Sequence, residues 1–206
     1  SNQVASTESE VERSMETYNA ASEEILMDNR LSTYERQHQL LELNEKKRAE
    51  LAEKIRESNN STTLEDQQKS AQVTALQKQL HALELDQELF KQAQRAAVKE
   101  EIAKINSKNI IDAIAPQFNT AKQELQANKQ LTELQKLEQL NSLERDLIVK
   151  VEEEIVRIKA EKVHEKSVNQ AKIDVLEKQI KATESAINTR KTQIESFEKD
   201  FISKQN

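Results

Sequence analysis

A heptad pattern runs without interruption through the last part of the chain. Between residues 173 and 201 the pattern positions alternate in spacing between three and four. This spacing places them on one stripe of a slightly under-wound helix, as in a coiled coil. The stripe is our candidate partner or oligomer seam, and it consists of Ile173, Leu176, Ile180, Thr183, Ile187, Arg190, Ile194, Phe197 and Phe201.

The composition favours the same class of fold along the whole chain. In 206 residues there is no glycine, and Pro116 is the one proline, so the residues that make tight turns are nearly absent. Aromatic residues form 3% and charged residues 33% of the chain, which suits narrow apolar seams better than a thick core. The sequence therefore predicts an all-α fold, an elongated antiparallel coiled-coil bundle of three long helices in a single domain, 1–206.

Local signals predict where these helices begin and end. Thr7 and Glu10 form a capping-box pattern, which predicts a first helix over 8–57. The heptad spacing of the first helix is interrupted near 29–32, and a second capping-box pattern lies there, which together indicate a kink. Four residues, Ser58–Ser61, predict a turn, since Asn substitutes for Gly where φ is positive. A second helix is expected over 62–114, because Pro116 lacks a backbone amide and disfavours helical angles in Ala115.

A third helix is expected over 117–204, with a polar joint at 159–172 that fits neither neighbouring seam. No Gly, Pro or Asn-Asn pair marks a turn there, which favours one continuous helix. The alternative is a chain reversal near Ser167–Gln170, which gives a four-helix up-down bundle.

The net negative charge of the chain is concentrated at its beginning. The net charge is −6, and residues 1–29 hold seven acidic residues and one basic residue. The remaining chain is balanced, which argues against nucleic acid as a partner, because such binding needs a basic stripe. The same balance weakens binding to anionic membranes. The sequence contains no run of 18 apolar residues, so it predicts no transmembrane segment.

The patterns of known catalytic and metal sites are missing from the sequence. There is no cysteine, and the histidines His38, His81 and His164 lie on separate segments without a paired ligand at helical spacing. Without glycine there is no phosphate-binding loop. We therefore expect no enzyme activity, no cofactor, no metal and no small-molecule substrate.

Two further features have both a structural and a functional interpretation. Polar residues Gln87, Thr183 and Arg190 occupy seam positions, where they either are tolerated at the seam edge or fix register and partner choice. An apolar cluster next to Pro116 either covers the end of the hairpin formed by the first two helices or forms an exposed tip for a partner. This candidate apolar tip comprises Ile110, Ile111, Ile114 and Phe118.

The expected function is that of a non-enzymatic coiled-coil structural or interaction protein, a spacer, tether or docking scaffold that binds a protein partner or a second copy along helix faces. The alternative is a membrane-acting helical protein, a curvature binder or a helical translocator or toxin component. Three long kinked helices resemble the BAR-domain plan in outline, although the clustered basic face of that plan is missing. The compartment is open between the cytoplasm and a secreted or surface-anchored state with its leader removed.

Overall fold

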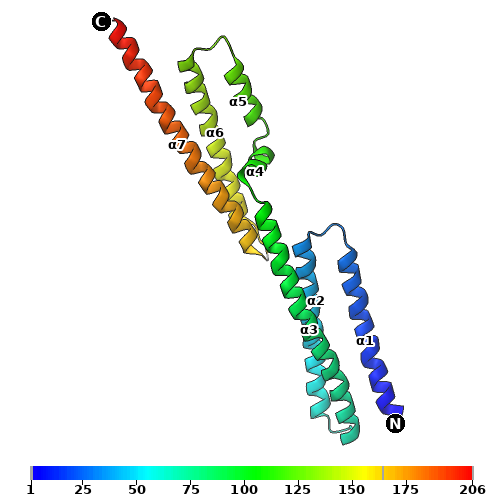
Figure 1. Ribbon diagram of the computed structural model, residues 1–206. Helices are drawn as coiled ribbons and strands as arrows, with labels where there is room; N and C mark the ends of the chain where they lie inside the picture. Colours follow the sequence, from blue (N-terminus) through cyan, green and yellow to red (C-terminus); the bar gives the residue numbers. More distant parts are fainter. Residues whose placement is uncertain (1, 164, 206) are drawn as a thin grey trace. The chain divides into compact units, whose positions relative to one another are not determined.

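A computed structural model describes residues 2–163 and 165–205, and Figure 1 shows them as helices joined by short turns. The described residues form an all-α helical bundle of seven helices, which confirms the predicted fold class. The chain divides into two compact units, residues 1–100 and 101–206, where the sequence predicted one domain.

The first unit is built from α1 (Asn2–Met27), α2 (Thr33–Asn60) and most of α3 (Asp66–Lys104). Successive helices run in opposite directions (Figure 1). Each helix contributes one apolar stripe to a shared core. The buried core residues are Val11, Met15 and Tyr18 of α1, Leu51 of α2, and Leu76 and Leu83 of α3.

The second unit contains α4 (Ser107–Ile114), α5 (Phe118–Ala127), α6 (Glu133–Ala160) and α7 (Lys166–Gln205). The helices α6 and α7 pack along each other, and α4 and α5 cover them. The buried core of this unit consists of Ile111, Ala115, Leu147, Val151, Ile155, Ile158, Ile173 and Leu176.

The kink expected near 29–32 is a complete chain reversal between α1 and α2. The Asp28 carboxylate accepts a hydrogen bond from the backbone amide of Arg30 at 3.0 Å, which closes a turn without glycine. Ser32 and Glu35 then form the capping box that starts α2. The capping pattern is therefore confirmed, while its interpretation as a bend in one helix is wrong.

The boundaries around the next turn also differ from the prediction. The helix α1 begins at Asn2, earlier than residue 8, and α2 continues through Asn60. The turn lies at 61–65, where Ser61 has φ −66° and ψ 132°, and among the described residues no non-glycine residue has positive φ. The turn thus needs no glycine substitute, because an extended residue is sufficient to end the helix.

The single helix expected over 117–204 is three helices, α5, α6 and α7. The helix α6 ends at Ala160, and the chain has reversed where α7 begins at Lys166, close to the alternative site Ser167–Gln170. The expected continuity fails because the apolar face of α7 is buried by packing back along α6, with Val168 and Ile173 each 5% exposed. That burial outweighs the absence of a strong turn residue.

Pro116 interrupts the helix as predicted. Ala115 leaves the helical region, with φ −137° and ψ 64°, and separates α4 from α5. At the other end of α4, the side chain of Asn106 accepts a hydrogen bond from the Asn109 amide at 2.8 Å and caps the helix.

We expect Leu176→Ala to lower the free energy of unfolding by about 2–5 kcal/mol, because it removes a fully buried side chain and leaves a cavity. Urea unfolding followed by circular dichroism measures the change. As a control, Leu89→Ala on an exposed face of α3 should change it by less than about 0.5 kcal/mol. Equal losses in the two variants would contradict the assigned core.

Candidate functional site: buried polar clusters and an exposed apolar face

A buried asparagine joins the three helices of the first unit. Asn44 on α2 is 0% exposed. Its side-chain amide donates to the hydroxyl of Tyr18 on α1 at 3.2 Å and to the backbone carbonyl of Leu83 on α3 at 2.9 Å. One side chain therefore bonds to both neighbouring helices, and such bonds are strong where water is excluded.

Arginine completes this cluster from the same helix. The Arg48 guanidinium donates through Nε to the Asn44 side-chain oxygen at 2.8 Å. With the Gln87 amide oriented so that its oxygen faces the donors around it, that oxygen accepts from Arg48 Nη2 at 3.1 Å and from Lys91 Nζ at 3.2 Å. We call Tyr18, Asn44, Arg48 and Gln87 the first polar cluster.

Burial changes the protonation behaviour around this cluster. Desolvation raises the pKa of the Tyr18 hydroxyl above its ordinary value of 10.0, partly offset by the hydrogen bond from Asn44. Burial also raises the pKa of Asp86. Removing these groups from water disfavours their charged forms. Tyr18 is therefore a neutral phenol at physiological pH.

A corresponding cluster lies in the second unit. Asn141 on α6 is 1% exposed and donates to the backbone carbonyl of Ile187 on α7 at 3.3 Å. Arg190 on α7 donates to the Asn141 side-chain oxygen at 3.4 Å and to Glu144 at 2.5 Å. The Glu144 side chain is 7% exposed and that of Arg190 17%. We call Asn141, Glu144 and Arg190 the second polar cluster.

Both polar clusters satisfy their buried groups within the protein. In each, an asparagine amide bonds across the interface and its oxygen accepts from a guanidinium. A slip of one residue between the helices would separate these partners and leave polar atoms buried without bonds. The function that this arrangement supports is structural, since the hydrogen bonds fix the register between the helices.

The polar seam residues have separate environments. Arg190 belongs to the second polar cluster and Gln87 to the first. Thr183 is 6% exposed, and its hydroxyl donates to the carbonyl of Gln179 one turn earlier at 2.8 Å. The side chain of Gln179 in turn accepts from Ser107 at the start of α4 at 3.1 Å.

The candidate seam of α7 divides into two parts. Its first part packs within the second unit, where Ile173, Leu176 and Ile187 are 5%, 0% and 6% exposed. Ile180 and Ile194 are half-buried. The last part is solvent-exposed, with Phe197 at 45%, Phe201 at 64% and the adjacent Ile202 at 59%. We call these last three residues the exposed α7 face.

The candidate apolar tip is part of the core in the structure. Ile111 is 7% exposed, and Ile110, Ile114 and Phe118 pack around the same buried cluster. They lie against α6 and α7 within the second unit, so they do not form an exposed tip. The reason is the break at Pro116, which lets α4 turn its strongly apolar side onto these helices.

Sequence reasoning missed Asn44, Asn141 and Glu144. The buried positions of α2 are residues 40, 44, 47, 51 and 58, which keep heptad spacing but place Asn44 and Lys47 inside the stripe. A search for apolar residues alone selects Leu41 and loses this register. A polar residue at a continuing heptad position was the available signal.

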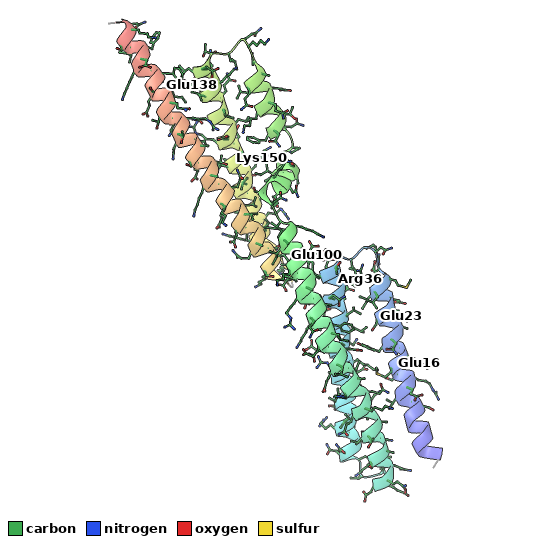
Figure 2. All side chains as sticks on the ribbon, in the orientation of Figure 1. Glu16, Glu23, Arg36, Glu100, Glu138 and Lys150 are labelled. Atoms are coloured by element: carbon green, nitrogen blue, oxygen red, sulfur yellow. The ribbon has the colours of Figure 1, made fainter. Side chains whose placement is uncertain are left out.

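Most charged side chains project away from the helix interfaces, including Glu16, Glu23, Glu138 and Lys150 in Figure 2. His38 lies 3.0 Å from Glu42, and His81 lies 3.9 Å from Glu84. His164 lies outside the described residues. Within residues 2–163 and 165–205, no three metal-binding side chains are grouped together.

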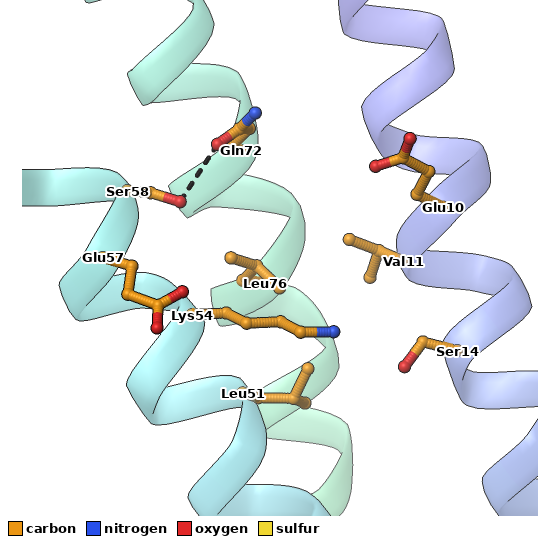
Figure 3. A pocket seen from close by; sticks show the side chains of 9 residues that line it. All are labelled: Glu10, Val11, Ser14, Leu51, Lys54, Glu57, Ser58, Gln72 and Leu76. Atoms are coloured by element: carbon orange, nitrogen blue, oxygen red, sulfur yellow. Dashed lines mark hydrogen bonds between the residues drawn. The ribbon is translucent and has the colours of Figure 1, made fainter. Parts of the chain in front are cut away.

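A recess lies near the turn between the last two long helices of the first unit. It has a volume of about 190 Å³ and lies between Val11 and Ser14 of α1, Leu51 and Ser58 of α2, and Leu76 of α3 (Figure 3). The Ser58 hydroxyl donates to the Gln72 side chain at 3.0 Å on its wall.

Comparisons with protein families, curated proteins and solved structures give no match to this chain. In the part of the chain that the structure describes, no helix is at once long and apolar enough to cross a membrane.

We expect Arg190→Met to lower the free energy of unfolding by about 3 kcal/mol, because Glu144 would remain buried without its cation. Adding Glu144→Leu should recover most of this loss, since no buried charge then remains. Chemical denaturation of both variants measures the two values. A double variant no more stable than Arg190→Met would contradict the pairing.

The difference in stability between the parent chain and Tyr18→Phe should depend on pH. Below pH 10 the variant should be less stable by about 0.5–1.5 kcal/mol, because it lacks the bond from Asn44. The folded pKa of Tyr18 lies above the unfolded one, so the contribution of Tyr18 is fully present below pH 10 and is lost as pH rises through the folded pKa. Thermal unfolding from pH 8 to 11 should therefore show a narrowing difference, while a constant difference would count against Tyr18 burial.

Proposed function

We propose that this protein is a non-enzymatic coiled-coil spacer or docking scaffold, which binds a second copy or another helical protein through a helix face. The observation that supports this is the exposed α7 face. Phe197, Phe201 and Ile202 lie within two turns of one helix with about half or more of their surface in water. Covering such side chains contributes on the order of 1.5–3 kcal/mol each.

The polar clusters support a rigid role more than a chemical one. Their buried polar atoms bond one helix to another in both units, through Asn44 in the first and Asn141 in the second. A scaffold needs a fixed register between its helices, so that the residues of a binding face keep their spacing.

The exposed α7 face also suggests how the membrane-acting alternative can be separated from the scaffold. Phe201 and Ile202 could enter a lipid interface, but Lys199 and Lys204 are accompanied by Glu198 and Asp200, so this end carries no net basic charge. Co-sedimentation with anionic vesicles at low salt tests that alternative. Binding that Phe201→Ser abolishes would favour it over the scaffold.

We expect Phe197→Ser combined with Phe201→Ser to reduce self-association of the chain at least tenfold, measured by sedimentation velocity across a range of concentrations. The matched control is Leu85→Ser with Leu89→Ser, a pair of exposed apolar residues on α3. This control should leave the association constant unchanged. Association that persists in the α7 variant, or a parent chain that is monomeric throughout, would remove the self-association form of the proposal.

A further inference from the structure

We infer that the chain is a tandem duplication of one three-helix unit of 100 residues. A residue in the first unit and the residue 100 positions later occupy the same place in their units. The helix bounds give the first indication. Both α2 and α6 have 28 residues, beginning at Thr33 and Glu133, and α3 and α7 begin at Asp66 and Lys166.

The turns before α2 and α6 have the same construction. Asp28 and Asn128 each accept a hydrogen bond from the backbone amide two residues later, at 3.0 and 2.9 Å. The next helix then starts with a capping box in both places, from Ser32 to Glu35 and from Thr132 to Gln135. The caps have φ and ψ of −66° and 162° in the first turn, and of −72° and 162° in the second.

A cation in the first turn of each of these helices has the same task. Arg36 donates to the backbone carbonyl of Asp28 at 3.0 Å, and Lys136 donates to that of Gln126 at 3.1 Å. Both bonds satisfy a carbonyl at the end of the preceding helix. The two units therefore share a side-chain contact across the turn as well as the turn itself.

Buried positions also recur after 100 residues, although the side chains differ. Eight pairs of residues 100 positions apart are buried in both members, in some pairs with a polar residue in place of an apolar one. These pairs are Val11 with Ile111, Met15 with Ala115, Asn44 with Glu144, Lys47 with Leu147, Leu51 with Val151, Ser58 with Ile158, Leu76 with Leu176, and Leu83 with Thr183.

The register between helices agrees to within one residue. Asn44 donates to the backbone carbonyl of Leu83. The counterpart of Asn44 is Glu144, and the counterpart of Leu83 is Thr183. In the second unit the corresponding bond runs from Asn141, three residues before Glu144, to the carbonyl of Ile187, four residues after Thr183. In an antiparallel pair, one turn back on one helix faces one turn forward on the other. The two polar clusters thus use the same helix alignment, one turn apart.

The recess in the first unit has a counterpart as well. In the second unit, a recess of about 330 Å³ is lined by six counterparts of the residues around the first one. These counterparts are Ile110, Ile114, Glu154, Arg157, Ile158 and Lys172, which replace Glu10, Ser14, Lys54, Glu57, Ser58 and Gln72 (Figure 3). The two copies keep the hollow and differ in the side chains that they present there.

Shared heptads do not account for this agreement. A common heptad pattern returns every seven residues, and 100 is not a multiple of seven. The main difference between the copies has a local cause, since Pro116 stands where the first unit has Glu16 and divides α4 from α5.

The test removes one period from inside a helix. Deleting residues 46–145 joins Glu45 to Asp146 and leaves α1, a hybrid of α2 and α6, and α7. If the units are copies, this hybrid keeps its core stripe and unfolds in one cooperative thermal transition. The control deletes residues 46–143, which rotates the second half of the hybrid helix by about 200°. We expect the control to melt at least about 10 °C lower or without cooperativity.

A second hybrid guards against a badly packed junction. Deleting residues 62–161 joins Ser61 to Lys162 in the turn and pairs the complete α1 and α2 with α7. Cooperative unfolding of either 106-residue hybrid, with the control clearly less stable, supports the duplication. The inference is overturned if neither hybrid unfolds cooperatively while the full chain does, or if the 98-residue deletion is as stable as the first hybrid.

Discussion

The bond from a buried asparagine to a carbonyl of the neighbouring helix sets the geometry on which the rest of each unit depends. Asn44 and Asn141 are buried away from water, where an unpaired amide would cost about 1–3 kcal/mol. Apolar stripes alone tolerate sliding by a turn, since Leu, Ile and Val replace one another with little penalty. The polar bond removes that freedom, because it is satisfied in one register.

The two polar clusters reach this result with different residues. In the first unit the guanidinium comes from Arg48 on the same helix, and a tyrosine hydroxyl adds the third helix. In the second unit Arg190 comes from the opposite helix and pairs with the buried Glu144. Since Phe118 stands at the counterpart of Tyr18, the second unit lacks that hydroxyl and holds two helices through an ion pair.

Sequence reasoning anticipated part of this structure. Heptad spacing and the absence of glycine were sufficient for the all-α class. The capping pattern at Ser32 and Glu35 is confirmed, although it was interpreted as a kink and in fact starts a new helix. The reversal at 28–32 was interpreted as a kink, and the reversal after Ala160 was predicted only as the alternative, a few residues too late. Extended non-glycine residues such as Ser32 and Glu161 flank these turns, and they carry a weak sequence signal. Asn44 and Asn141 were overlooked because the search followed apolar residues alone.

The sequence by itself determined that this chain forms helices with narrow apolar stripes and that one of them breaks at Pro116, since propensity, caps and proline act within a turn or two of backbone. Only the tertiary structure decided that the chain reverses after Met27 and after Ala160, and which part of the α7 stripe is buried. These outcomes depend on contacts between residues far apart in sequence, such as Asn141 with Ile187. As a result, Leu176 is fully buried while Phe201 is exposed to solvent, although both belong to the same unbroken heptad pattern.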